Sequence, residues 1–137
     1  MEITMPDKSC YNFVAKQMMP SGMTAQITFY GDYWDDQRTA EFSVWLVVYK
    51  KRKDISKLFL KQTGKDGLKT LLFAKEAIRE FEKYILREFG NCHQKIFINI
   101  EWDDNRRRDI YYRGLKNDGF EFRYFRGRKI LSKEIKN

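Results

Sequence analysis

The stretch Thr63-Gly64-Lys65-Asp66-Gly67, followed by an uninterrupted helical pattern from Leu68 to Phe89, decides how this chain folds. The residues before it alternate as strands do, and the residues after it predict a strand, a short helix and a closing hairpin. A glycine loop that opens a long helix directs unpaired backbone N–H groups and the positive helix end at one point. That arrangement suits an anion such as a phosphate, so we predict a ligand site there.

The helix that follows the loop has one apolar face and one charged face. Thr63 and Asp66 have the spacing of a capping box at its start, and Gly90 predicts its end. The residues predicted to lie on the buried face are Leu68, Leu71, Leu72, Ile78, Phe81, Ile85 and Phe89.

Strands are predicted on the N-terminal side of the loop. Residues 11–19 are moderately apolar and are followed by Pro20, which predicts an outer strand. Residues 23–30 alternate with the period of a strand that buries one face, and turn-forming residues follow at 31–38. Residues 40–50 are apolar on both faces, so this strand is predicted to be central in its sheet.

The segment between the last of these strands and the loop fits two structures. Asp54 as an N-cap, with Ile55, Leu58 and Phe59 at helical spacing, favours a helix, whereas the run 58–60 favours a short strand. If the segment is helical, two helices joined by a tight turn follow one another, as in helix-turn-helix proteins that bind DNA. Both interpretations stay open for residues 54–62.

The residues after the long helix complete the predicted fold. Residues 96–102 alternate as a strand, which we expect to be a parallel crossover partner of the strand before the loop. A helix is predicted over 105–116, then a strand over 120–125 and a hairpin strand over 129–135, with a tight turn at Arg126-Gly127-Arg128. The chain of 137 residues is therefore expected to be one α+β domain. Its mixed, mainly antiparallel sheet packs on one long helix of about residues 67–89.

The composition indicates in which cellular compartment the protein is expected and whether a metal site is expected. Cys10 and Cys92 lie far apart and form no CxxC pattern, which indicates a reduced intracellular protein. His93 is the one histidine, so we expect no metal site. No apolar run is long enough to span a bilayer and no signal peptide is recognisable, so we expect a cytoplasmic protein without a membrane partner.

The net charge of +8 is unevenly distributed. Residues 50–72 carry 8 Lys and Arg against 2 Asp and Glu, and residues 103–137 carry 11 against 6. The positive excess thus lies in the approach to the glycine loop and in the C-terminal third. A distribution of this kind favours an anionic partner such as nucleic acid, a nucleotide cofactor or an acidic protein.

The order of strands, glycine loop, long helix, strand, short helix, Gly119-Phe120 and closing hairpin resembles the GNAT family of N-acetyltransferases. In that family a strand ends in Arg/Gln-x-x-Gly-x-Gly/Ala, whose backbone amides hold the pyrophosphate of acetyl-coenzyme A. Here the first glycine of the motif is present, but Asp66 stands where the small residue belongs. The resemblance, which covers roughly residues 22–135, implies acetyl-coenzyme A binding by Lys61, Gln62, Thr63, Gly64, Lys65, Gly67 and Asn105.

The resemblance also implies a catalytic residue. Asn105 and Tyr112 have the spacing of the family's second signature, in which the tyrosine is often the general acid for the coenzyme thiolate. Three extra residues separate Tyr112 from Gly119, and the N-terminal helix pair that shapes the family's acceptor site has no room here. From the strand pattern, Glu101 is a candidate general base. The implied function is that of an acyl-coenzyme A-dependent N-acyltransferase or a degenerate non-catalytic relative.

Two further function classes follow from the charge pattern. One is a nucleic-acid-binding protein, in which cations contact phosphates and exposed rings stack on bases. Its candidate cations are Lys51, Arg52, Lys53, Arg106, Arg107, Arg108, Arg113, Arg123, Arg126, Arg128 and Lys129, interleaved in the C-terminal third with Tyr111, Tyr112, Phe122, Tyr124 and Phe125. The other is a small basic protein that binds or inhibits an acidic protein partner.

Overall fold

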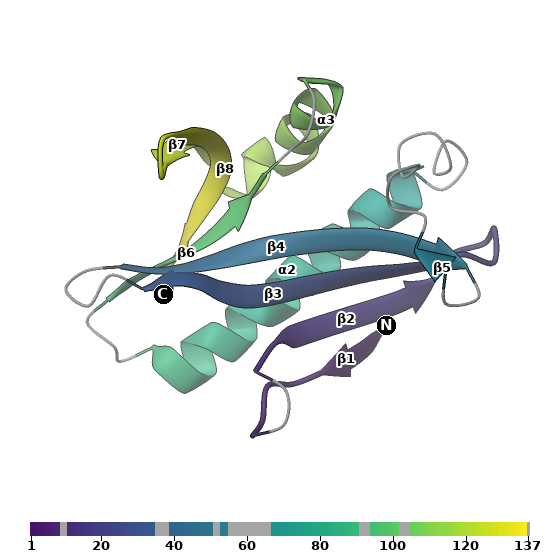
Figure 1. Cartoon of the computed structure of the whole chain (residues 1–137), viewed down its shortest axis with the longest axis horizontal. Helices are drawn as coiled ribbons and strands as arrows, with labels where there is room; N and C mark the ends of the chain where they lie inside the picture. Colours follow the sequence, from purple (N-terminus) through teal and green to yellow (C-terminus); the bar gives the residue numbers. More distant parts are fainter. Residues whose placement is uncertain are drawn as a thin grey trace. The chain divides into compact units, whose positions relative to one another are not determined.

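A computed structural model describes residues 1–8, 11–34, 39–50, 53–54, 67–90, 94–101 and 105–136. For residues 32–34, 50, 53–54, 67 and 106–107 it describes the backbone alone. In these ranges the chain is an α+β protein with a long helix α2 (Gly67–Phe89), a short helix α3 (Asn105–Leu115) and a 3-10 turn η2 (Lys116–Asp118) (Figure 1). The strands are β1 (Glu2–Thr4), β2 (Phe13–Met18), β3 (Thr24–Trp34), β4 (Thr39–Lys50), β5 (Lys53–Asp54), β6 (Lys95–Ile100), β7 (Glu121–Phe125) and β8 (Arg128–Ile135).

Hydrogen bonds connect the strands in the order β1-β2-β3-β4-β6-β8-β7, with the two-residue β5 beside β4. β4 and β6 are parallel over residues 39–43 and 95–99. The pairs β1–β2, β2–β3, β4–β5, β6–β8 and β7–β8 are antiparallel. The mixed, mainly antiparallel sheet is therefore confirmed, as is the parallel crossover partner expected after the long helix.

Several predicted boundaries need correction. β2 was expected to be an outer strand, but it lies between β1 and β3. β1 was not predicted, because three residues are too few to show an alternating pattern. β3 continues through Gly31 to Trp34, where a turn was predicted, because strand pairing overrides weak local preferences. The segment 55–62, open between strand and helix, lies outside the described residues.

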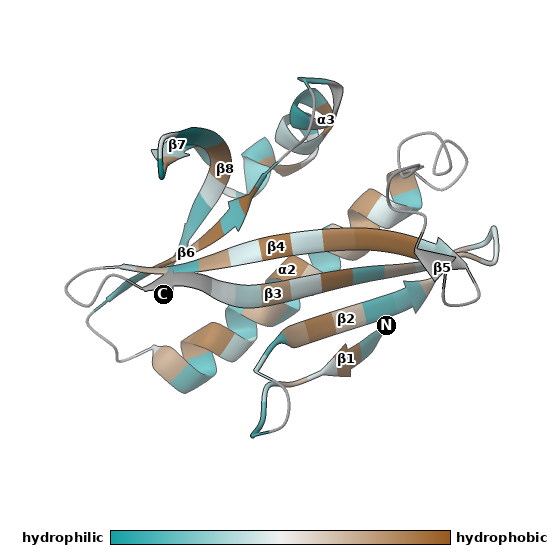
Figure 2. Cartoon of the chain, viewed as in Figure 1, coloured by the Kyte–Doolittle hydropathy of each residue, from teal (hydrophilic) through white to brown (hydrophobic). Residues whose placement is uncertain are grey.

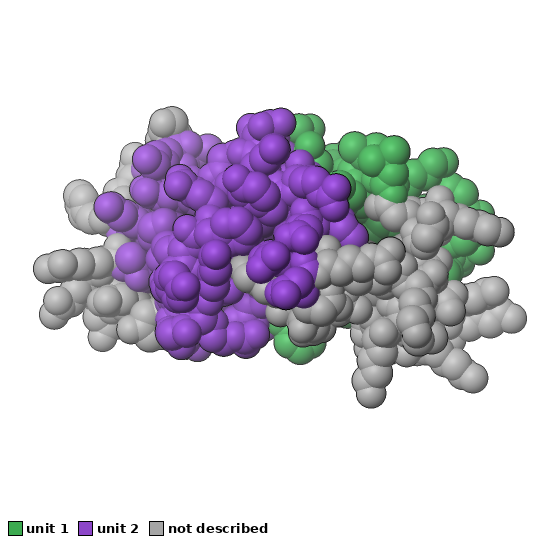
Figure 3. Space-filling model, turned by 90° about the horizontal axis from the view of Figure 1, so that it is seen from above, with its two compact units in different colours: residues 1–29, 45–81 green, residues 30–44, 82–137 purple. Residues whose placement is uncertain are grey.

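The chain forms two compact units (Figure 3). Unit 1 comprises Met1–Phe29 and Trp45–Phe81, and unit 2 comprises Tyr30–Val44 and Glu82–Asn137. β3, β4 and α2 contribute residues to both. The expectation of a single domain stays a prediction.

Three phenylalanines form the centre of unit 1. Phe13 of β2 pairs with Phe29 of β3 across the antiparallel ladder, so both side chains leave the sheet on the same face. The Phe29 ring stacks on the Phe81 ring of α2 with centroids 4.3 Å apart, and the Phe13 ring meets both edge-on at 5.7 and 5.4 Å. All three side chains are fully buried. Hydrophobic and polar residues alternate along the first part of β3, residues 24–30 (Figure 2).

The buried face of α2 differs from the predicted one. Leu68 and Leu72 were assigned to it, but they are 70% and 54% exposed, and Phe89 is also exposed. Leu68 and Leu72 each lie two residues, or about 200° around the helix axis, from buried Thr70. Leu71 is intermediate in exposure, whereas the assignments of Ile78, Phe81 and Ile85 are confirmed. The buried residues of α2 are Thr70, Phe73, Ala74, Ala77, Ile78, Phe81 and Ile85.

The turns of the C-terminal segment agree with the sequence. Gly119 has φ of +96° and closes η2 in the left-handed conformation that glycine tolerates. Arg126 and Gly127 both have positive φ, as a two-residue hairpin turn requires, and they join β7 to β8. Among the described residues, neither α-helix combines the length and the apolar character needed to cross a bilayer.

The Phe81→Ala variant tests the packing of unit 1. We expect it to lower the free energy of unfolding by about 3–5 kcal/mol, because it removes a buried ring and leaves a cavity. Leu72→Ala on the same helix is the matched control and should change it by less than about 0.5 kcal/mol, because Leu72 is exposed. Urea denaturation of both variants measures the difference. Equal losses would contradict the assigned helix face.

Candidate functional site

Most of the predicted coenzyme site falls on residues that the structure does not describe. Lys61, Gln62, Thr63, Gly64 and Lys65 lie outside the described residues, as do Lys51 and Arg52 among the predicted cations, and for Lys53 only the backbone is described. Gly67 is the first residue of α2, which agrees with the predicted start of the helix.

The first turn of α2 carries no acidic residue, and it exposes Lys69. An acidic side chain is the usual complement of the positive end of a helix, and a lysine there adds to the positive potential. The side-chain hydroxyl of Thr70 is buried and has no hydrogen-bond partner among the described residues. In the described part of this helix end, Lys69 is thus the exposed charged side chain, and Asp66, directly before Gly67, lies outside the described residues.

Unit 2 contains a buried polar cluster that the sequence did not indicate as a site. It consists of Glu41 of β4, Asn99 of β6, Ser132 of β8 and Arg123 of β7, and we call it the Glu41 network. Glu41 is 1% exposed, and Asn99 and Ser132 are also buried. Adjacent strands bring the residues together, because Asn99 lies opposite Ser132 in the antiparallel β6–β8 ladder.

Hydrogen bonds on both ends of the Asn99 amide orient this side chain at the centre of the network. The Asn99 amide Nδ2 donates to Glu41 Oε1 at 2.7 Å. Its Oδ1 accepts from Ser132 Oγ at 2.7 Å and from Arg123 Nη2 at 3.1 Å. Arg123 Nη2 also forms an ion pair with Glu41 Oε1. The buried carboxylate thus receives a cation and a neutral donor, which compensates for the loss of water.

Arg123 is the member of the network that reaches the surface. Its guanidinium lies 4.0 Å from the centroid of Phe97 and 5.5 Å from that of Phe125, and its Nε is buried with no hydrogen-bond partner among the described residues. It borders an open pocket of about 490 Å³ in unit 2, which is lined by Phe97, Gly119, Glu121, Phe122, Arg123, Ser132, Lys133, Glu134 and Lys136. Arg123 and Asn99 both bind the Glu41 carboxylate, so the network connects the strands that carry these residues in one register.

The two predicted catalytic residues have other contacts. The Tyr112 ring stacks on Phe122 of β7 with centroids 4.8 Å apart, and Lys116 Nζ lies 5.8 Å from the Tyr112 ring. Glu101 is exposed and pairs with Arg128 at 3.4 Å. Within the described residues Tyr112 and Glu101 share no contact, so their catalytic roles stay predictions. Asn105, also predicted to bind the coenzyme, is the exposed first residue of α3.

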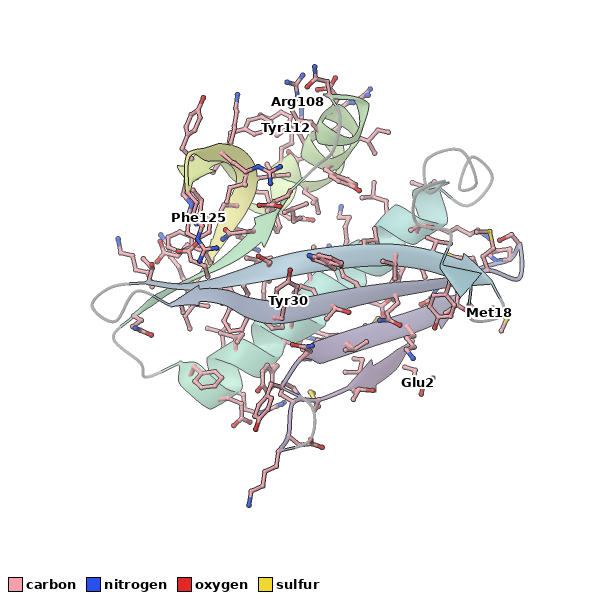
Figure 4. The ribbon with its side chains drawn as sticks, in the orientation of Figure 1. Glu2, Met18, Tyr30, Arg108, Tyr112 and Phe125 are labelled. Atoms are coloured by element: carbon pink, nitrogen blue, oxygen red, sulfur yellow. The ribbon has the colours of Figure 1, made fainter. Side chains whose placement is uncertain are left out.

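The predicted cations of the C-terminal third are distributed over α3 and the β7–β8 hairpin (Figure 4). Arg108 pairs with Asp109 at 3.0 Å, and Arg113 Nε donates to the backbone oxygen of Asp109 at 3.4 Å. The Arg126 guanidinium lies 5.2 Å from the Phe125 ring centroid. Arg106 and Arg107 are in α3, but their side chains are not described.

The sequence analysis did not identify the Glu41 network, because an alternating pattern does not show that the face carrying Asn99 is also buried. Residues 98–100 of β6 are all buried, so both faces of the strand are covered there. Two features of the sequence could have indicated buried polar residues. Asn99 lies between Ile98 and Ile100, and Glu41 precedes Phe42 in an apolar strand. Such residues in a central strand require partners.

Burial raises the pKa of Tyr84 in α2, and the negative charge of Glu88 raises it further, while Arg87 lowers it. The phenol therefore stays neutral well into the alkaline range. Tyr84 also meets the ring of Phe89 edge-on, with centroids 6.3 Å apart. These contacts give Tyr84 a packing role.

No protein-family model, curated protein or solved structure matches the chain. No group of three or more His, Cys, Asp or Glu side chains that could hold a metal ion occurs in the described part of the chain, from which Cys10, Cys92 and His93 are absent. The identification of the candidate sites therefore depends on the geometry of the described residues alone.

The Arg123→Ala variant tests the Glu41 network. We expect a loss of about 3 kcal/mol in the free energy of unfolding, because the variant leaves a buried carboxylate without its cation. Arg128→Ala is the matched control, since its ion pair with Glu101 is exposed and should contribute less than about 1 kcal/mol. Adding Glu41→Gln to Arg123→Ala should restore part of the loss by removing the charge. If urea denaturation shows that Arg123→Ala lowers the free energy of unfolding by no more than Arg128→Ala does, the network does not stabilise the fold.

Proposed function

We propose that this chain is a GNAT-like protein that binds an acyl-coenzyme A at the N-terminus of α2. The observation that supports this most directly is the parallel pairing of β4 with β6 in an otherwise antiparallel set of described pairings, with α2 as the crossover between them. In a crossover of this kind, the loop after the first strand and the N-terminus of the helix form the usual anion site. The element order is also the one on which the GNAT resemblance rests.

The electrostatics of α2 favour the same ligand. From Gly67 on, its first turn has no carboxylate, and exposed Lys69 adds a cation to the positive end of the helix dipole, where it would offset the charge of the preceding Asp66. A pyrophosphate would satisfy backbone N–H groups that have no partner within the helix. Each favourable charge contact of this type contributes about 0.3–1 kcal/mol at an exposed helix end.

The geometry supports coenzyme binding more directly than catalysis. Acyl transfer needs a base for the amine and an acid for the departing thiolate. Tyr112 and Glu101, the candidates for these roles, contact Phe122 and Arg128. The proposal therefore includes both an N-acyltransferase and a non-catalytic relative that keeps the coenzyme site. A cytoplasmic location, where acyl-coenzyme A is available, belongs to the same proposal.

Calorimetric titration with acetyl-coenzyme A tests the binding site. We expect saturable binding below about 1 mM, the usual upper limit for such ligands. Pantetheine, which lacks the pyrophosphate, should not bind in this range. Lys69→Ala should weaken acetyl-coenzyme A binding a few-fold, whereas Lys83→Ala, further along α2, should leave it unchanged. No binding of acetyl-coenzyme A at millimolar concentration would disprove the proposal.

Release of free thiol from acetyl-coenzyme A in the presence of primary amines tests catalysis. If the protein is an acyltransferase with Tyr112 as its general acid, Tyr112→Phe should lower kcat by about 100-fold or more while coenzyme binding is retained. Tyr111→Phe is the control on the same helix. Unchanged turnover in Tyr112→Phe would assign the acid to another residue, and no turnover with any amine would favour the non-catalytic relative.

A further inference from the structure

A row of aromatic and cationic side chains lies on α3 and the β7–β8 hairpin, within unit 2. Tyr112 stacks on Phe122 with centroids 4.8 Å apart, and Lys129 Nζ lies 4.6 Å from the Phe122 ring. Lys116 Nζ lies 5.8 Å from the Tyr112 ring. We call the set Tyr112, Lys116, Phe122, Tyr124 and Lys129 the cation–aromatic row. Figure 4 labels Tyr112 on α3, beside the hairpin.

Tyr124 extends this row into solvent. It lies two residues after Phe122 in β7, so both side chains leave the strand on the same face. Lys129 is its partner in the β7–β8 ladder. Tyr124 is 72% exposed, and it makes no hydrogen bond, ion pair or ring contact with another described residue. Its ring is therefore available for stacking, whereas Tyr112 and Phe122 already stack on each other.

The charge around the row is strongly positive. Residues 105–136 carry 11 Lys and Arg against 4 Asp and Glu. Lys116, Lys129 and Arg126 are exposed, and the two lysine ammonium groups lie over rings of the row. A cation held against a ring keeps its charge while its orientation is restricted. The row therefore combines oriented positive charges with a solvent-exposed ring.

We propose that the cation–aromatic row binds single-stranded nucleic acid, with Tyr124 stacking on an unpaired base and with Lys116 and Lys129 contacting backbone phosphates. Alternating aromatic and cationic groups match the alternation of bases and phosphates along a single strand. A duplex offers no unpaired base for Tyr124. An acidic protein offers charge, but its carboxylates give Tyr124 no flat surface on which to stack. Tyr124, Lys116 and Lys129 are not among the residues proposed to hold the coenzyme, so this proposal does not depend on coenzyme binding.

Fluorescence anisotropy with a labelled 12-nucleotide oligo-dT and the corresponding oligo-U tests the proposal on the full chain. Tyr124→Ala should weaken binding by about 5- to 100-fold, because one base loses its stacking partner. Tyr124→Phe keeps the ring and should retain the affinity. Tyr11→Ala is the matched control, because Tyr11 is 82% exposed in unit 1, and it should bind as the parent protein does.

The salt dependence of the same measurement tests the phosphate contacts. Lys129→Ala should reduce the slope of log K against log salt by about 0.7, the value for one contact with a single strand. Lys95→Ala, an exposed lysine at the start of β6, should leave the slope unchanged. Equal effects of Tyr124→Ala and Tyr11→Ala would overturn the proposal. Polyglutamate binding as tightly as the oligonucleotides, with no effect of Tyr124→Ala, would overturn it in favour of an acidic protein partner.

Discussion

The buried carboxylate of Glu41 is the constraint on which the structure of unit 2 depends. An ionised group at 1% exposure is tolerated only when charge and hydrogen bonds replace its lost water. Its partners Asn99 and Arg123, together with Ser132, come from three further strands, so one network ties β4, β6, β8 and β7 to a single register. A slip of one residue in any of these strands would turn a partner to the opposite face of the sheet. The network therefore specifies the register as well as contributing to stability.

Unit 1 is stabilised in a different way. The rings of Phe13, Phe29 and Phe81 exclude water and pack edge-on and face-on, without any directional hydrogen bond between them. Such packing stabilises through area and shape, and it tolerates repacking more readily than a buried ion pair does. Ring packing in unit 1 is thus non-directional, whereas the hydrogen bonds and ion pair of unit 2 are directional and specify strand register.

The two proposals on ligand binding rest on different physical effects. At the start of α2 the attraction comes from backbone N–H groups and the helix dipole, reinforced by Lys69. On the cation–aromatic row it comes from side chains, and the rings add a preference for flat groups. The first arrangement suits a compact anion such as a pyrophosphate, and the second suits an extended polyanion. The uneven charge of the chain is consistent with both surfaces.

The sequence by itself determined the order of most elements. Apolar periodicity located α2 and the main strands, and Arg126-Gly127-Arg128 marked a hairpin turn, because these patterns reflect local geometry. Tertiary structure decided which faces are buried. Leu68 and Leu72 look like core residues and are exposed, whereas Glu41 and Asn99 look like surface residues and are buried. Burial depends on which strands and helices become neighbours, and that is a property of chain segments far apart in the sequence. For the same reason, only the folded hairpin distinguished Tyr124, with its ring free in solvent, from Tyr112 and Phe122, which pack against each other.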